Sequence, residues 1–210
     1  MMKVEIRDDK VLIDGYVNAV ERDSKVLRDH KGTPFIERIK AGCFKRALSR
    51  ANNTRSYVKV LLNHNYDREL TSTHDSTTKL FEDSIGLRCQ CEIRDKEVVE
   101  DAKSGKLTGW SFGFIPIKQT RVAPEGSVEH RDVEELELRE VSILDNTRIP
   151  AYDGTSIETR SESIDDVIEI RFSNDETEVV DKTTKAKEET FNNHEWENRY
   201  LATRANLVSS

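Results

Sequence analysis

Short stretches of alternating or continuously apolar residues dominate the first two thirds of the chain and predict mainly β-strands. Six such stretches, rich in β-branched and aromatic residues, lie at 10–20, 57–64, 78–83, 86–93, 109–122 and 133–145. Residues 42–51 and 95–107 instead have the composition and spacing of helices, the first opening after Gly42 and the second closing at Gly105. A turn around Asp83 to Gly86 predicts a β-hairpin.

This order of elements limits the fold class. Six strands with two short helices cannot form regular βαβ units, so the sheet should be mainly antiparallel. We therefore predict a β-dominant α+β fold, built as a closed antiparallel β-barrel with a few surrounding helices.

The amino-acid composition changes near residues 150–160, and this change divides the chain into three predicted parts. Residues 1–155 form the folded domain, and residues 156–190 an acidic, largely disordered linker. Residues 157–190 hold eleven acidic and five basic residues, which accounts for most of the net charge of -7. Within this stretch the segment VIEIRF could add one strand. Residues 191–210 recover an apolar stripe through Trp196, Tyr200 and Leu207, which predicts a terminal amphipathic helix.

Charge and hydropathy exclude two classes of protein. A net charge of -7 and a pI near 5.4, without a Lys/Arg-rich block, argue against nucleic-acid binding, which needs a basic face. There is no apolar run of the roughly 20 residues that cross a bilayer, and the first ten residues lack a signal peptide's apolar core. We expect a soluble protein made in a cytoplasm, with no membrane partner.

The cysteine count argues against a disulfide framework. Cys43, Cys89 and Cys91 are an odd number in a chain without a secretory signal. Cys89 and Cys91 share one face of a strand, which favours packing over a metal or redox pair. A zinc site would need C-x-x-C spacing and further ligands, which are lacking.

Ser111 is the first residue with possible chemistry. It lies in the segment GWSFGF, with a glycine two residues away on each side. On a strand the three aromatic residues share one face, and Ser111 shares the other with the glycines. Their missing side chains leave room for a backbone or a substrate to approach. A small serine on a tightly packed strand would give the same pattern.

A serine nucleophile also needs an imidazole to take its proton and a third group to hold the imidazole's tautomer. His64 ends the apolar segment YVKVLLNH, where a rigid strand could hold an imidazole beside an open loop. Glu140 alternates with Leu136 and Leu138 on one strand face, and an inward carboxylate needs a partner. Each residue alone is more often structural, but together they suggest a serine hydrolase.

A metal-dependent hydrolase is a rival reading of the same region. Four residues of metal-ligating type crowd one short segment, namely His64, Asp67, His74 and Asp75. This alternative leaves Ser111 and its glycines unexplained, so we expect no metal and no cofactor.

Taken in order, these segments resemble the prohead maturation proteases of tailed bacteriophages, relatives of the herpesvirus assemblin serine proteases. The resemblance runs over about residues 11–155. It passes through GYVNAV, FIERIKAGCFKRAL, VKVLLNHN, LFEDSIGLRCQCEI, GWSFGF and REVSILDNTRIPAY, of which LLNHN and WSFGF are the most specific. It implies an assemblin-like fold and a serine endopeptidase.

The resemblance also assigns roles to residues. It places His64 at the family's catalytic histidine, Ser111 at its nucleophile and Glu140 at the third member. The herpesvirus relatives have a second histidine as third member, so Asp145 is the alternative here. Two histidines follow it as weaker candidates: His74 and His130.

Two further positions bear on the same comparison. Arg148, in the loop DNTRIPAY, is the residue that we expect to support the oxyanion, by analogy with a loop of the herpesvirus enzymes. Asn65 stands where the family often has an aspartate directly after the catalytic histidine.

The biological role implied by the resemblance is capsid maturation. Such an enzyme is packaged inside the phage prohead in the infected bacterial cytoplasm, cleaves scaffold sequence from the major capsid protein and digests itself. The herpesvirus relatives require dimerisation, which leaves a homodimer open here. The terminal helix would dock the protease to scaffold or capsid protein, with the acidic stretch as spacer and self-cleavage site. The main alternative is a non-enzymatic capsid assembly or scaffold-associated factor.

Overall fold

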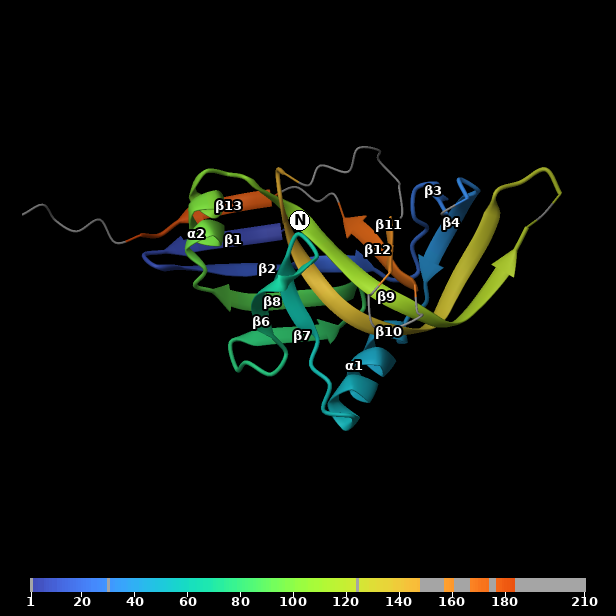
Figure 1. Ribbon diagram of the computed structural model, residues 1–210, viewed down its shortest axis with the longest axis horizontal. Coiled ribbons are helices and arrows are strands. Elements are labelled where there is room, and N and C mark those ends of the chain that lie inside the picture. The colour runs from blue at the N-terminus through green and yellow to red at the C-terminus, as the bar shows by residue number, and fades with distance from the viewer. Residues whose placement is uncertain are drawn as a thin grey trace, which may run out of the picture.

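The computed structural model describes residues 2–29, 31–123, 125–147, 157–160, 167–173 and 177–183, and these form two β-sheets and two helices (Figure 1). The first sheet has five strands in the order β13-β1-β2-β8-β7. Their bounds are β1 Met2–Arg7, β2 Lys10–Ala19, β7 Thr78–Glu82, β8 Gly86–Ile93 and β13 Thr177–Asp181.

The second sheet has eight strands, six of them in the order β11-β12-β9-β10-β4-β3, while β5 pairs with β10 and β6 pairs with β5. Their bounds are β3 Leu27–Arg28, β4 Pro34–Ile39, β5 Lys59–Leu62, β6 Asn65–Ser72, β9 Leu107–Val122, β10 Glu129–Asp145, β11 Ile157–Arg160 and β12 Val167–Ser173.

Strand burial follows from the sequence pattern. In β2 and β8 every second residue is buried, so one face of the first sheet meets the core and the other carries polar groups. In β9 the six consecutive residues 109–114 are all buried, and so are residues 140–145 of β10. These two stretches are therefore covered on both faces.

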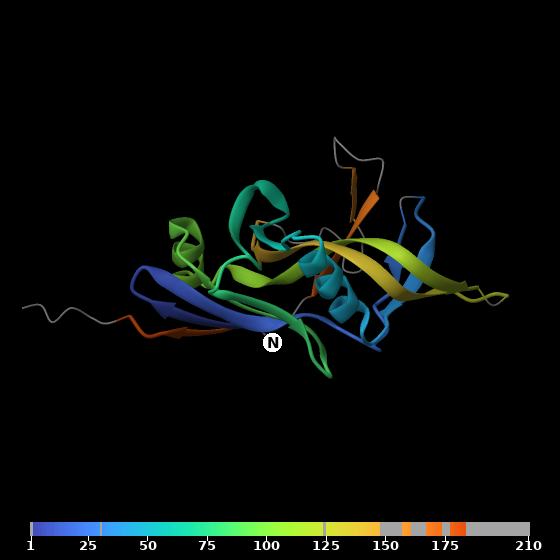
Figure 2. The ribbon, with the colours of Figure 1, turned by 90° about the horizontal axis from the view of Figure 1, so that it is seen from below.

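The pair of β9 and β10 organises the second sheet. Both strands are long, and the end at which a turn joins them extends to one side of the molecule next to β3 and β4 (Figures 1 and 2). Along its other edge β10 takes two separate parallel partners, β4 beside residues 129–133 and β5 beside residues 140–143. The free edge of β9 is occupied by β12 at residues 110–114.

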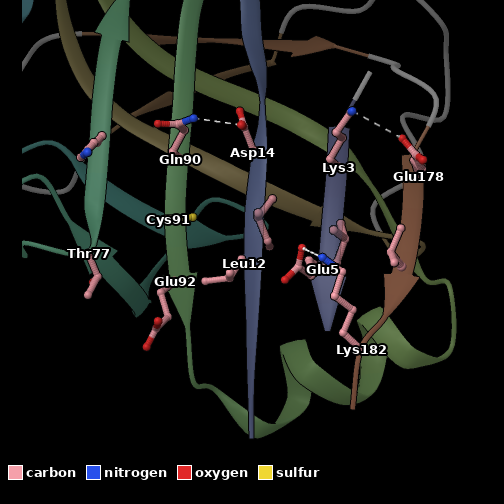
Figure 3. Close-up of a pocket in the computed structure, with 14 residues that line it drawn as sticks. Lys3, Glu5, Leu12, Asp14, Thr77, Gln90, Cys91, Glu92, Glu178 and Lys182 are labelled. Carbon is pink, nitrogen blue, oxygen red and sulfur yellow. Dashed lines mark hydrogen bonds and ion pairs between the residues drawn. The ribbon is translucent and has the colours of Figure 1, made fainter. Parts of the chain in front are cut away.

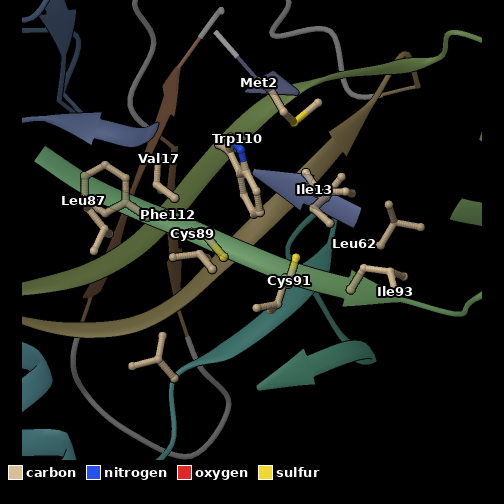
Figure 4. Close-up of a cluster of buried hydrophobic side chains, with 14 of the residues drawn as sticks. Met2, Ile13, Val17, Leu62, Leu87, Cys89, Cys91, Ile93, Trp110 and Phe112 are labelled. Carbon is tan, nitrogen blue, oxygen red and sulfur yellow. The ribbon is translucent and has the colours of Figure 1, made fainter. Parts of the chain in front are cut away.

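The core lies between the two sheets (Figure 4). Met2 and Ile13 of the first sheet pack in one cluster with Trp110 and Phe112 of β9, all at most 1% exposed. Helix α1, Cys43–Asn53, joins this cluster through Phe44, whose ring meets that of Phe112 edge-on.

Both helices start at well-defined caps. Glu82 of β7 accepts hydrogen bonds from the backbone N–H groups of Gly42 and Lys45, which satisfies free donors at the start of α1. Helix α2, Lys96–Lys103, is capped by Asp95, whose side chain accepts from the N–H groups of Glu97 and Val98.

The structure confirms the predicted strands, both helices and the β7–β8 hairpin. It also confirms that the pairing is mainly antiparallel, with parallel pairs only at β1–β13, β10–β4 and β10–β5 among the described strands. Strands β1, β3, β4, β6, β11 and β13 were not predicted. The segment VIEIRF, expected to add a strand, forms β12.

The prediction of a closed barrel was wrong. Within the described residues neither sheet closes, because both end in edge strands. The edge of β10 that a barrel would pair with the other sheet is taken by β4 and β5. The two sheets instead meet face to face through apolar side chains.

The predicted division at residues 155 and 190 stays a prediction. Strands β12 and β13 lie inside the stretch predicted as an acidic linker, and they pair with β9 and β1 respectively. The predicted terminal helix at 191–210 lies outside the described residues. No helix in the part of the chain that the structure describes is long and apolar enough to span a membrane.

Candidate active site

His64 lies in a tight turn between two strands. Leu62 of β5 pairs with Asn65 of β6, so Asn63 and His64 form a two-residue hairpin loop. Their φ angles are 54° and 60°, the left-handed values that a type I′ hairpin turn requires at both central positions. Asparagine and histidine tolerate this region better than most residues. His64 therefore projects from a turn. The sequence had instead suggested that it ends the strand.

Strand β10 holds this turn in place. The backbone N–H of Asn63 donates to the carbonyl of Ile143 over 3.0 Å, and the Asn63 amide oxygen accepts from the N–H of Asp145 over 3.1 Å. The N–H of His64 donates to the hydroxyl of Ser142 over 3.1 Å. These three bonds fix the position of the imidazole relative to β10.

Glu140 joins the imidazole from β10. Its Oε1 lies 2.8 Å from Nδ1 of His64, and its Oε2 accepts the Ser142 hydroxyl over 2.6 Å. The carboxylate is 1% exposed, and a buried charge needs such partners on both oxygens. A closed ring of hydrogen bonds thus links Glu140, the His64 side chain, the His64 backbone and Ser142.

This ring determines the histidine tautomer. An ionised carboxylate only accepts hydrogen bonds, so Nδ1 of His64 carries the proton and donates it to Glu140. In the neutral ring Nε2 is then an acceptor. Among the described residues Nε2 is buried and has no hydrogen-bond partner. An imidazole in this state is ready to accept a proton at Nε2.

Gly113 makes room for the carboxylate. It pairs with Glu140 across β9 and β10, and a Cβ atom there would lie 2.6 Å from Oε1 of Glu140. Such a contact is too short for any side chain. The second glycine of GWSFGF therefore admits the glutamate, where the sequence had suggested room for a backbone or a substrate.

Ser111 lies two pairs further along the same strands. It is opposite Ser142 on β10 and opposite Phe172 on β12, and residues paired across strands share a face of the sheet. Ser111 is fully buried, and its hydroxyl donates to the carbonyl oxygen of Arg171 over 2.7 Å. The hydroxyl is thus directed to β12 and not to the imidazole. The ring of Phe172 in turn meets the His64 ring edge-on, with centroids 5.7 Å apart.

The other residues singled out by sequence lie elsewhere. The Asp145 side chain accepts from the backbone and hydroxyl of Thr147. The His74 ring packs on a tyrosine, and His130 pairs with an aspartate of another loop. Arg148 lies outside the described residues. Of the candidate third members, Glu140 is the one that contacts His64.

Three of the four residues of the metal hypothesis contact different partners. His64 contacts Glu140, and His74 packs on Tyr57. Asp75 accepts from the Thr71 hydroxyl. In the described part of the chain, no three or more His, Cys, Asp or Glu side chains gather in a way that could hold a metal ion.

A cavity of about 630 Å³ lies on the polar face of the first sheet, away from these residues (Figure 3). Its charged groups pair with one another, for example Lys3 with Glu178 and Lys182 with Glu5. Its lining contains none of the three candidate residues and no hydroxyl next to an imidazole. We therefore place the candidate site at β9 and β10.

Sequence reasoning missed four contributing residues. Ser142 could have been found, because it follows Glu140 by two residues and so shares its strand face. The role of Asn63 had a weaker signal in its preference for left-handed backbone. The contact of Arg171 and Phe172 with the site had no local signal, because β12 follows Ser111 by about 60 residues.

Comparison with known proteins agrees with this geometry. Residues 1–169 match the family model of the caudovirus prohead serine protease. No curated protein and no solved structure matched the chain. Because the match covers most of the chain, the protein belongs to the caudovirus prohead serine protease family and is a serine endopeptidase of phage capsid maturation.

Proposed function

We propose that Ser111 is the nucleophile of this endopeptidase, that His64 is its general base and that Glu140 is the third member of the triad. The observation that carries the assignment is the buried hydrogen bond from Nδ1 of His64 to Glu140, with Nε2 unpartnered among the described residues. Ser111 is linked to this pair through Ser142, which lies opposite it on β10 and accepts the backbone N–H of His64. A catalytic triad is recognised by such geometry and not by the order of its residues in the chain.

The chemistry follows from these positions. His64 Nε2 takes the hydroxyl proton as Oγ of Ser111 bonds to the carbonyl carbon of the substrate. Glu140 stabilises the imidazolium that forms. His64 then gives the proton to the leaving amine, the C–N bond breaks, and water releases the acyl group from Ser111 by the same steps in reverse roles.

The substrates proposed here are proteins of the assembling capsid. Membership of the family implies capsid proteins as substrates and a location inside the prohead of the host cell. We propose more specifically that the enzyme removes scaffold sequence from the major capsid protein and finally cleaves itself. Arg148 remains our candidate for oxyanion support, because it follows the last residue of β10, Asp145, by three positions in the sequence.

Intact-mass spectrometry of the purified full-length chain over time tests the assignment. The wild type should shorten, and a Ser111→Ala variant should stay whole, because loss of the nucleophile lowers the rate about a million-fold. Ser84→Ala, at an exposed position in the β7–β8 turn, is the matched control and should behave as wild type. Shortening of both the wild type and Ser111→Ala at one rate would show that Ser111 is not the nucleophile. Loss of cleavage on adding a chelator would favour the metal-dependent alternative.

A further inference from the structure

Strand β12 covers the candidate nucleophile. It lies antiparallel along β9, with Phe172 opposite Ser111 and Ile170 opposite Gly113. The Arg171 carbonyl accepts the Ser111 hydroxyl over 2.7 Å, which leaves Nε2 of His64 without that proton. In this arrangement the nucleophile is inaccessible and is hydrogen-bonded away from its base.

The same arrangement has the geometry of a bound peptide. Extended peptides bind by adding a strand to an exposed sheet edge, where main-chain bonds supply affinity and side-chain pockets supply specificity. A substrate must also bring its carbonyl within about 3–3.5 Å of the attacking oxygen. The Arg171 carbonyl group already lies at Ser111: its oxygen is 2.7 Å from Oγ, held there by the hydrogen bond from the hydroxyl.

The side chains of β12 occupy two kinds of subsite. Ile168 and Ile170 are buried at 5% and 4% exposure, and Phe172 packs on the His64 ring, so alternate residues fill apolar positions on the site face. Arg171 points to the other face. There its guanidinium makes two hydrogen bonds, of 2.7 and 2.8 Å, to the buried carboxylate of Glu37.

The acidic subsite is built for a cation. Glu37 is 4% exposed and comes from β4, a strand that does not pair with β12. The Arg171 guanidinium also lies 5.2 Å from the Phe114 ring centroid, within range of a cation–π contact. A bidentate arginine–carboxylate pair is among the more specific contacts that a protein can make.

We propose that the edge of β9 under β12 is the substrate-binding edge of the protease, and that β12 occupies it as an internal substitute for substrate. The substrate is then an extended segment with apolar residues at alternate positions, as in Ile168, Ile170 and Phe172. A basic residue, in the place of Arg171, stands between the second and third apolar residues, and the carbonyl of this basic residue lies at Ser111. This inference rests on the proposed function, since it assumes that Ser111 is the nucleophile. Cleavage by the wild type then proceeds only through the fraction of molecules in which β12 has left this edge.

Weakening β12 in the full-length chain tests this. Arg171→Glu places a third carboxylate beside Glu37 and Glu169 and should unseat the strand. Arg88→Glu is the matched control, because Arg88 has a similar two-bond pair with Asp14 on the first sheet, away from β12. Hydrogen exchange then reports whether residues 167–173 have lost protection while the rest of the fold keeps it.

The readout is the rate at which a fluorophosphonate probe labels Ser111, followed by intact mass. We expect Arg171→Glu to be labelled at least about tenfold faster than the wild type and Arg88→Glu. A synthetic peptide of residues 166–174, DVIEIRFSN, should slow the labelling of Arg171→Glu, and the same peptide with glutamate in place of arginine should not. If Arg171→Glu does not fold, Ile170→Ala provides the same comparison with a milder change.

The outcomes separate the two proposals. Faster labelling that the peptide reverses supports the substrate-binding edge. Labelling of Ser111 at one rate in all variants, with β12 shown by exchange to be released, overturns the inference and leaves Ser111 as nucleophile. No labelling of Ser111 in a chain whose β12 is released overturns the proposed function, and the inference with it.

Discussion

Replacing Glu140 by Gln should lower the reactivity of Ser111 by about 10⁴-fold, as the acid-to-amide change does in a well-studied triad. That factor corresponds to about 5 kcal/mol of transition-state stabilisation. The change keeps the shape of the side chain and removes its charge. Its effect follows from the hydrogen bonds that the two carboxylate oxygens accept, one from Nδ1–H of His64 and one from the Ser142 hydroxyl.

An amide cannot satisfy both partners as the carboxylate does. If its NH₂ group faces His64, Nδ1 must become an acceptor, so Nε2 carries the proton and cannot take one from Ser111. If its oxygen faces His64, the NH₂ group points at the Ser142 hydroxyl, whose O–H then has no acceptor in place of the Glu140 oxygen. In both orientations the imidazolium loses the negative charge that stabilises it.

The assay is the rate at which a fluorophosphonate probe labels Ser111. The rates are compared in Arg171→Glu chains with and without Glu140→Gln, so that β12 does not limit access to Ser111 in either chain. Asp145→Asn is the matched control, because Asp145 contacts Thr147 and keeps an acceptor oxygen as asparagine. We expect it to change the rate less than tenfold. A large loss in Asp145→Asn together with a small loss in Glu140→Gln would refute our choice of the third member.

Two other predictions concern packing. Gly113→Ala should lower the labelling rate by about 10²-fold or more, because the new Cβ would lie 2.6 Å from the Glu140 carboxylate and displace it from His64. A rate within a few-fold of wild type, in a chain with unchanged thermal unfolding, would contradict this account. The cysteines should resist alkylation: burial raises the pKa of Cys43 to about 12, and a hydrogen bond from Cys91 together with burial raises that of Cys89 well above its usual value. Because a raised pKa leaves the thiol protonated, maleimide at pH 8 should modify the folded chain about 10³-fold more slowly than the urea-unfolded chain, and equal rates would count against buried thiols.

The sequence predicted those parts of the fold that depend on local pattern. Alternation marked β2 and β8, and a run of apolar residues around Ser111 marked the middle of β9. Strand β6, NYDRELTS, was missed because it is mostly exposed and carries three charged residues, so its place is set by pairing with β5 and not by burial. Strand β1, MKVEIR, does alternate between apolar and charged residues, but it was not among the predicted strands.

The candidate site depends on contacts that no local pattern encodes. His64, Ser111 and Glu140 were selected from sequence with their strands, yet the partner of each had to come from the structure. The closed barrel was wrong for the same reason. Counting strands does not reveal that β10 takes β4 and β5 in turn along one edge, a choice made by long-range pairing.

The two halves of the site differ in what supports them, and this difference bears on how activity could be switched on. The bonds that position the His64–Glu140 pair come from the β5–β6 turn and from β10, and none of them involves β12. The Ser111 hydroxyl, by contrast, is bonded to β12. Release of β12 would therefore free the nucleophile and leave the base and its carboxylate in place. On this reasoning activation needs no rebuilding of the catalytic residues, only the exchange of one strand on the edge of β9 for another.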